Sequence, residues 1–192
     1  MIQKFKPITS LVAPLLIDNI DTDQICAAEF LKITDKSGLG QQLFANWRTQ
    51  PDFILNQKPY RATQILLAHK NFGCGSSREH AVWALKQYGF KVIIASSFAD
   101  IFKSNALKND LLAIELPLSV IDLMHQAVMT VPQSITIDLV QQQVIWNETK
   151  ITFAIDAYSK NRIINDLDDI SYTLTFNELI TAYEKAHPSI GW

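Results

Sequence analysis

A short glycine-containing run between a strand-like and a helix-like segment constrains the fold of this chain more than any other feature. The run from Asn71 to His80 holds two glycines, two serines, an arginine, a glutamate and a histidine. It follows the apolar segment 64–68, which reads as a strand, and precedes 81–88, where apolar residues recur at helical spacing. The sequence therefore predicts a strand, a tight polar turn and a helix in succession.

The segments on either side continue this alternation. Strands are expected at 8–17, 64–68, 91–95 and 111–116, and helices at 81–88 and 98–108. Because strands and helices alternate in this order, an α/β architecture with parallel strand pairing is predicted. Shorter helical pieces are expected before Leu31 and between Gly40 and Arg48.

The C-terminal third has a different pattern. After a helix near 120–128, three short segments alternate apolar and polar residues, at 135–139, 144–146 and 151–155. Such alternation predicts an antiparallel meander. Two further helices are expected, at 157–165 and 176–186, the second ended by Pro188.

Length and composition exclude several classes of function. A chain of 192 residues with 48% hydrophobic residues can bury a sizeable core and is expected to form one domain over 1–192. A net charge of -2 and a pI near 6.1 give no general attraction to nucleic acid or to a membrane surface. No signal peptide and no apolar segment of bilayer-spanning length is found, so a soluble, cytoplasmic protein is expected.

Only Cys26 and Cys74 are present. A disulfide framework is therefore not expected. Two thiols are also too few for a four-cysteine zinc site or a typical iron–sulfur cluster. No metal site is expected on this chain, and a reaction that needs such a metal would require another chain to supply it.

The serine loop, residues 73–80, has a purely structural interpretation. Ser76 and Glu79 have the spacing of a capping box, in which each side chain bonds a free amide of the helix start. This does not account for the second serine, the arginine and the glycines together. Glycines let a helix N-terminus approach an anion closely, and the guanidinium of Arg78 suits a carboxylate. The functional hypothesis is a site for a small carboxylate-bearing ligand.

Ser76 can act as a base only with help. A helix terminus supplies about 0.3 to 1 kcal/mol, less than the roughly 1.36 kcal/mol that lowers a pKa by one unit. Backbone donors, exclusion of water and a nearby metal would all have to contribute. The isolated chain is therefore expected to be a poor catalyst.

Other loop chemistries fit less well. The loop lacks the Gly-Lys-Ser/Thr ending of a nucleotide-binding P-loop and the second glycine of a serine-hydrolase elbow. His80 lies on the helix and is expected to pack or cap. The three carboxylates of the turn 18–23 could bind a hard cation, or they could bond their own backbone. A second serine-rich turn, 96–105, follows the next strand, so it is expected to cap a helix and could face the same pocket.

Four segments together resemble a known family. Residues 21–25, 43–48, 71–80 and 97–102 are similar, in order, to the small subunits of bacterial 3-isopropylmalate dehydratase. The sequence Gly-Ser-Ser-Arg-Glu-His at 75–80 is specific to the aconitase superfamily. The resemblance implies an aconitase-type swivelling β/β/α domain with a mixed sheet, flanking helices and a C-terminal helical extension.

The resemblance also implies an activity and a partner. The chain would be one half of a cytoplasmic heterodimeric hydro-lyase of leucine biosynthesis, which interconverts 2-isopropylmalate and 3-isopropylmalate through isopropylmaleate. The large subunit would carry a 4Fe-4S cluster, and this chain would carry no cofactor and no metal. The other expected partner is the dicarboxylate substrate, with no nucleic acid and no membrane.

Roles for individual residues follow from the same resemblance. Ser76 would be the base, Arg78 would hold the substrate carboxylate, and Asp23 would complete the catalytic group. Ser77, Thr22 and Gly75 would join Arg78 in binding the substrate.

The chain departs from its relatives at a few positions. Cys26, Ala27 and Ala28 stand where relatives commonly read Ile-Pro-Lys, and Lys103, Ser104 and Asn105 replace a Tyr and paired Asn. Asp110 and Asp166 stand where relatives often carry Gly or an amide. Two alternatives stay open: the small subunit of a related dehydratase acting on homoaconitate or a short alkylmalate, and a divergent non-catalytic regulatory subunit. RNA binding is a third, but the chain has no basic stripe.

Overall fold

The parallel part of the fold agrees with the predicted alternation of strands and helices. The computed structural model describes residues 5–32 and 38–187. The first four strands are β1 (Ile8–Leu15), β2 (Ile65–Ala68), β3 (Val92–Ala95) and β4 (Leu112–Glu115). Helix α3 (His80–Tyr88) connects β2 to β3, and α4 (Asp100–Lys108) connects β3 to β4. β1 to β4 pair in parallel, which confirms the β-α-β-α-β prediction.

β1 joins two kinds of pairing in one seven-stranded sheet of order β4-β3-β2-β1-β5-β6-β7. Its second half, Val12 to Leu15, pairs in parallel with β2, and its first half, Ile8 to Leu11, pairs antiparallel with β5. The second half is continuously buried, whereas the first half is only partly covered. This difference is expected, since parallel strands are covered on both faces.

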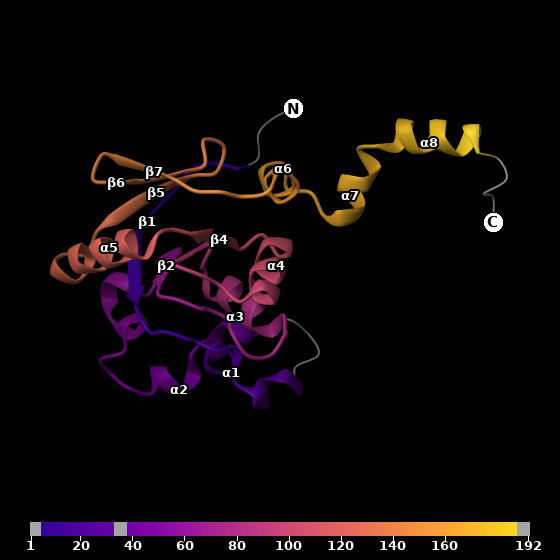
Figure 1. Cartoon of the computed structure of the whole chain (residues 1–192). Helices are drawn as coiled ribbons and strands as arrows, with labels where there is room; N and C mark the ends of the chain where they lie inside the picture. Colours follow the sequence, from indigo (N-terminus) through magenta and orange to yellow (C-terminus); the bar gives the residue numbers. More distant parts are fainter. Residues whose placement is uncertain (1–4, 33–37, 188–192) are drawn as a thin grey trace.

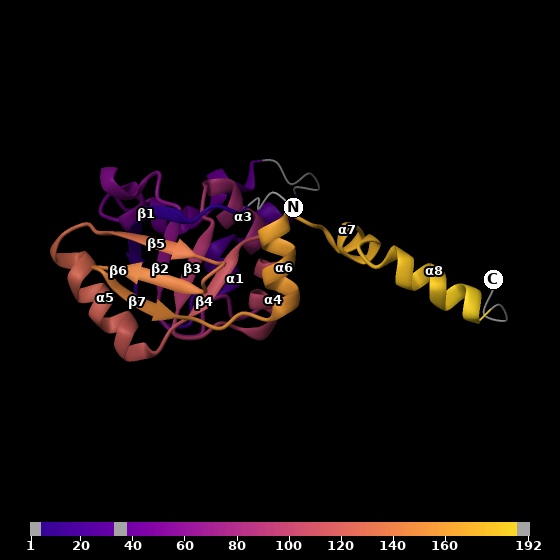
Figure 2. The same cartoon turned by 90° about the horizontal axis from the view of Figure 1, so that it is seen from above.

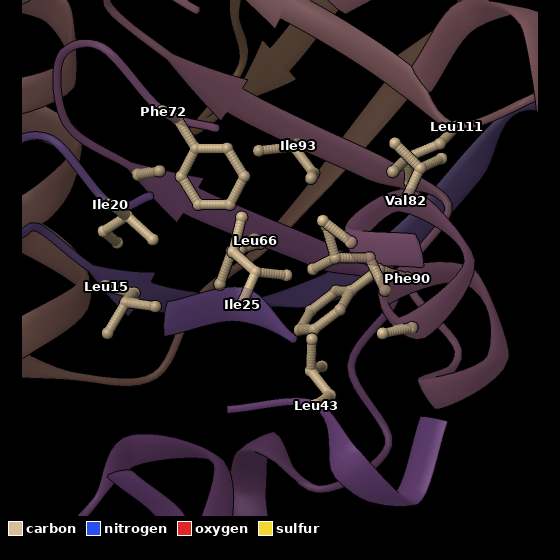
Figure 3. Packing of buried hydrophobic residues seen from close by; sticks show 14 of the residues in the cluster. Leu15, Ile20, Ile25, Leu43, Leu66, Phe72, Val82, Phe90, Ile93 and Leu111 are labelled. Carbon is tan, nitrogen blue, oxygen red and sulfur yellow. The ribbon is translucent and has the colours of Figure 1, made fainter. Parts of the chain in front are cut away.

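Successive residues of the parallel strands point into two separate cores. Leu66 and Ile93 contribute to the core beneath α1 (Thr22–Ile25), α3 and α4, as Figure 3 shows. Their neighbours Ile65 and Ile94 contribute to the core on the opposite face, with α5 (Leu118–Thr130). The two-residue period of a strand produces this division. Buried on both faces, the parallel strands hold their carboxyl ends, and the loops that follow them, in fixed positions.

The segment between β1 and β2 forms short helical turns in place of the helix expected up to Arg48. These are α1, η1 (Ala28–Lys32), η2 (Leu39–Gln42), α2 (Ala45–Arg48), η3 (Ile54–Asn56) and η4 (Lys58–Tyr60). Phe44 interrupts the expected helix because its backbone is left-handed, with φ 49°. Its fully buried ring stacks on Trp47 at 5.2 Å between ring centres. Packing of this ring outweighs the local helical preference.

The C-terminal third forms the predicted meander and helices. β5 (Ser134–Asp138), β6 (Gln143–Trp146) and β7 (Thr149–Thr152) pair antiparallel, and α6 (Ala157–Asn165) follows. α8 (Asn177–Ala186) confirms the last expected helix, and α7 (Asp169–Leu174) is an additional one that was not predicted. Figures 1 and 2 both show α7 and α8 projecting away from the sheet.

Within the described ranges, no helix combines the length and the apolar character needed to cross a bilayer.

Candidate active site

Two left-handed asparagines bring the turn after β1 against the turn after β2. Asn19 and Asn71 each have φ 56°, and the Nδ2 of Asn71 donates to the Oδ1 of Asn19 at 2.8 Å. Asparagine tolerates this backbone region better than most residues. The backbone continues the contact, because the amide of Gly73 donates to the carbonyl of Ile20 at 2.7 Å. Sequence reasoning missed this pair, although both asparagines lie in the turns that follow β1 and β2.

Gly73 allows the serine loop to lie close to α4. Its φ is +77°, and a Cβ built there would lie 2.1 Å from Cγ of Phe102. No larger residue fits both the conformation and the space. The ring of Phe102 packs against those of Phe72 and Phe98 at 5.3 and 6.2 Å between centres. An aromatic cluster therefore supports the loop on the side that faces α4.

Thr22 joins the serine loop to the N-terminus of α1. Its amide donates to the carbonyl of Cys74 at 2.9 Å, and its Oγ1 accepts from the amide of Ser76 at 3.1 Å. The side chain is buried, with 3% of the residue exposed. Between these two bonds lies Gly75, with φ +91° and only 3.5 Å from its Cβ position to the Thr22 hydroxyl oxygen. The structure thus places Thr22 and Gly75 in direct contact beside Ser76.

Asp23 and Arg78 form an ion pair across the site. The Nη1 of Arg78 donates to the Oδ1 of Asp23 at 2.6 Å, and both side chains are partly open to solvent. The sequence places these residues 55 positions apart. Strand order brings them together, because the turns after β1 and β2 lie at the same edge of adjacent parallel strands.

The capping box that the spacing of Ser76 and Glu79 allowed does not form. α3 begins at His80, its N-cap is Glu79, and no side chain caps it. The Oε1 of Glu79 accepts instead from the Nδ2 of Asn109 at 3.3 Å. A capping box forms nearby at α1, where the amides of Asp21 and Gln24 each donate to the other's side chain, at 2.8 and 2.7 Å. The glycine-rich backbone reaches α3 without the turn that a serine cap requires.

As a result, the polar groups of the serine loop remain available. Among the described residues, no group bonds the hydroxyls of Ser76 and Ser77, and the amides of Ser77, Arg78 and Glu79 donate to no acceptor. Ser76 is half-buried and Ser77 is exposed. Free amides ahead of a nine-residue helix, beside a guanidinium, form an environment that favours an anion.

The three carboxylates of the turn 18–23 do not converge on one point. Asp18 pairs with His69 and Lys70, Asp21 caps α1, and Asp23 meets Arg78. The hydrogen bond from His69, together with Lys70, lowers the pKa of Asp18, against some desolvation. In the described part of the chain, no group of three or more potential ligands is arranged to hold a metal ion. Each of the three carboxylates therefore has a separate partner.

The second serine-rich turn supports the loop and does not cap α4. The N-cap of α4 is Ala99, without a side-chain bond. The Oγ of Ser97 accepts from the amide of Asn71 at 2.9 Å, and the Nδ2 of Asn105 donates to the carbonyl of Ser77 at 3.3 Å. The two turns therefore meet, as expected from neighbouring strands. Asn105 was not singled out as a support, and its position one helical turn into α4 was the available signal.

Neither thiol is arranged as a metal ligand or a nucleophile. Burial raises the pKa of Cys26 and of Cys74, and Asp23 and Asp21 respectively raise it further. The Sγ of Cys74 donates to the carbonyl of Asn19 at 3.4 Å. Both are free cysteines. The donor set on this chain does not fit an iron–sulfur cluster.

The serine loop is partly open to solvent, with Ser77 exposed and Ser76 and Arg78 half-buried. Four hollows of about 350 to 460 Å³ occur elsewhere on the described surface. One of them, between α4 and α6, is lined by Lys103, Ser104 and Arg162. None of the four is lined by Ser76 or Arg78. A small ligand bound at the loop would be left exposed on one side, so enclosure must come from another molecule.

Comparison with known proteins identifies the class. The aconitase C-terminal domain matches residues 2–119, which include every strand of the parallel half and the serine loop. The crystal structure of a 3-isopropylmalate dehydratase from Methanocaldococcus jannaschii superposes with a TM-score of 0.68 at 27% identity, covering 93% of this chain and 99% of that one. The chain is thus an α/β protein of the aconitase family.

Comparison with curated relatives narrows the family assignment further. The 3-isopropylmalate dehydratase small subunit of Oenococcus oeni is 49% identical over 98% of this chain and 100% of its own length. The same subunit of Streptococcus thermophilus is 46% identical over 97% of this chain and 98% of its own length. The chain belongs to the family of 3-isopropylmalate dehydratase small subunits.

Proposed function

We propose that this chain is the small subunit of a cytoplasmic 3-isopropylmalate dehydratase, a hydro-lyase of leucine biosynthesis. The observation that carries the proposal is the near-full-length similarity to subunits of that name. It is joined by a serine loop in which, among the described residues, the two serine hydroxyls and the amides of Ser77, Arg78 and Glu79 make no hydrogen bond. The enzyme would interconvert 2-isopropylmalate and 3-isopropylmalate by removing water and adding it back in the opposite sense.

Ser76 is the proposed base. Its hydroxyl, deprotonated in the assembled site, would take the proton from the carbon next to a substrate carboxylate, while the hydroxyl group leaves the neighbouring carbon. The product is the alkene isopropylmaleate. Because Thr22 bonds the amide of Ser76 and not its hydroxyl, the backbone is held while the reacting oxygen stays free. In the reverse direction the same oxygen would return a proton.

Arg78 is the proposed anchor for the substrate carboxylate. A guanidinium presents five donors in a planar fork, so Arg78 can keep its bond to Asp23 and still bind a second carboxylate. The free amides of Ser77 and Glu79 lie next to it in the chain. Asp23 would hold the orientation of Arg78, and Ser77, Thr22 and Gly75 would complete the binding loop.

The large subunit is proposed to close the site. A helix N-terminus contributes about 0.3 to 1 kcal/mol, which is too little to produce a serine alkoxide near neutral pH. A 4Fe-4S cluster on that subunit would supply a Lewis acid for the departing hydroxyl, as the donor set of this chain cannot. The partner would also exclude water from a loop that is open on its own.

The test is an assay of the reconstituted pair. The chain is co-expressed with the large subunit of the same organism, and hydration of isopropylmaleate is measured, together with that of homologous substrates. We expect Ser76→Ala to lower kcat by at least about 1000-fold without preventing assembly. Ser119→Ala, an exposed serine at the start of α5, is the matched control.

Two results would overturn the proposal. If Ser76→Ala keeps the rate within a few-fold, the chain is not the source of the base and a regulatory role gains support. If the intact pair hydrates a different unsaturated acid and leaves isopropylmaleate unchanged, the substrate assignment is wrong.

A further inference from the structure

The C-terminal arm, residues 166–187, exposes large apolar side chains that contact no core. α7 and α8 contain no buried residue. Figures 1 and 2 show the arm extending beyond the sheet and its helices. The exposed large apolar residues of the arm are Ile170, Leu174, Phe176, Leu179, Ile180 and Tyr183. A soluble chain rarely leaves such a series uncovered, and contiguous apolar surface of this kind marks an interaction site.

The apolar residues of α8 form one stripe. Phe176, Leu179, Ile180 and Tyr183 stand at i, i+3, i+4 and i+7, the spacing of anchors on a helix that lies in a groove. The ring of His187 stacks on Tyr183 at 4.2 Å and extends the stripe by one turn. α8 is therefore amphipathic, but its apolar face packs against no part of the core.

The base of the arm is fixed to the body. The hydroxyl of Tyr158 on α6 donates to Asp169 at 2.6 Å, and its ring packs edge-to-face on Tyr172 at 4.7 Å. Tyr172 in turn contacts Phe176 at 5.3 Å. The buried guanidinium of Arg162 donates to the carbonyl of Leu167 at 2.8 Å. These contacts give α8 a defined direction, so it is presented by the body and is not a loose tail.

The charge of the arm indicates what covers it. Residues 166–187 hold five carboxylates and one lysine, whereas the whole chain has a net charge of only -2. Asp168 caps α7 and Asp169 bonds Tyr158, so on α8 itself the charged side chains are Glu178, Glu184 and Lys185. A complementary surface would be an apolar groove with a basic rim. The carboxylates of the arm are Asp166, Asp168, Asp169, Glu178 and Glu184.

We infer that α8 docks its apolar stripe into a basic-rimmed groove on the large subunit. This inference rests on the proposed function, which supplies that partner. The alignment with the Oenococcus oeni small subunit covers 98% of this chain, so the arm belongs to the shared subunit and is not an appendage of this one. The inference adds a second contact between the subunits, separate from the serine loop.

A second copy of this chain is a weaker choice of occupant. α8 has ten residues and is about 15 Å long. One stripe of that length falls short of the roughly 800 Å² per partner that a stable complex buries. The arm is therefore better explained as one part of a larger interface. The proposed function already requires such an interface, because the large subunit must enclose Ser76.

The test compares two double variants of the full chain. Ile180→Asp with Tyr183→Asp places charges on the stripe, whereas Thr181→Asp with Ala182→Asp places the same charges on the adjacent faces of the helix. Binding to the large subunit is measured by titration calorimetry, and self-association of each isolated chain by sedimentation. We expect the stripe variant to raise the Kd at least tenfold and the control to stay within about threefold.

The outcomes separate the two proposals. Equal Kd values for both variants, or a stripe variant that changes self-association alone, would overturn the docking of α8. Unaltered melting of the isolated stripe variant shows that the body is intact, since these side chains are not buried in it. If the wild-type pair assembles but does not hydrate isopropylmaleate, the proposed function fails. The comparison of Kd values still shows whether α8 docks on the large subunit. If the wild-type chains do not associate, both fail.

Discussion

The guanidinium of Arg78 donates to the carboxylate of Asp23 at 2.6 Å, joining the turns that follow two neighbouring parallel strands. The Asp23 side chain is 55% exposed, so the bond is open to competition from other carboxylates. In the uncomplexed chain, Asp23 thus takes one donor of the Arg78 fork and leaves the other donors for a substrate carboxylate.

The two partners of this bond are expected to contribute unequally. Arg78→Ala should raise KM for isopropylmalate by about 10- to 100-fold, because a hydrogen bond to a charged group contributes roughly 1.5 to 3 kcal/mol. Arg78→Lys should restore only part of this, as an ammonium cannot match the planar fork. Steady-state kinetics of the reconstituted pair provide the measurement.

Asp23→Asn supplies the comparison. An exposed ion pair contributes about 0 to 1 kcal/mol, so the KM change should stay below about fivefold if Asp23 only orients Arg78. A loss in kcat equal to that of Ser76→Ala would show instead that Asp23 takes part in the chemistry.

Gly73→Ala should destabilise the chain by about 3 kcal/mol. The substitution combines left-handed strain with a clash against the ring of Phe102. For a chain of this size the melting temperature should fall by roughly 6 to 12 °C. Gly38→Ala is the matched control, since its φ is also positive, at +84°, but no atom lies within 4 Å of the added Cβ. Similar losses for both variants would show that the contact with Phe102 has no energetic importance.

The bond between His69 and Asp18 predicts a pH dependence at the acid end. The pKa of Asp18 is lowered from 3.8 in the folded chain, first by this bond and then by Lys70. The folded state therefore binds fewer protons than the unfolded state, so the stabilisation is present above about pH 4 and is lost as pH falls through the lowered pKa. The melting temperature of Asp18→Asn should lie below wild type at pH 6 and converge with it as the pH falls further below 4.

Asp52→Asn controls for the change in net charge, because no ion pair of Asp52 occurs among the described residues. A gap between wild type and Asp18→Asn that persists at pH 2 would contradict the assigned role of His69.

Arg162 is expected to be essential for the junction between α4 and α6. Its side chain is 4% exposed, and its Nη2 donates to the carbonyls of Leu107 and Lys108, each at 2.8 Å. Arg162→Met should cost about 1.5 to 3 kcal/mol, because it leaves the buried carbonyl of Leu107 without its charged donor. Chemical denaturation gives the free energy of unfolding. Lys160→Met, on the same helix but with partners nearer the surface, should cost less than about 1.5 kcal/mol.

Periodicity was enough to predict the elements of this fold that are long or fully buried. β3 and α6 were located to within one residue, because a continuous apolar run and a capped amphipathic segment are local signals. α7 was missed, since six residues of mixed polarity carry too little periodicity. The left-handed Phe44 was missed because its conformation is chosen by packing against Trp47, which no local pattern records.

The sequence by itself determined the alternation of strands and helices, the shortage of metal ligands and the composition of the serine loop. These depend on residue type and spacing along the chain. Only the tertiary structure decided that Ser76 is backed by Thr22 and not by Glu79, that Asp23 meets Arg78, and that α8 stands clear of the core. Such contacts join residues about 55 positions apart, and they follow from the order in which β1 and β2 pair in the sheet. Spacing along one segment carries no information about that order.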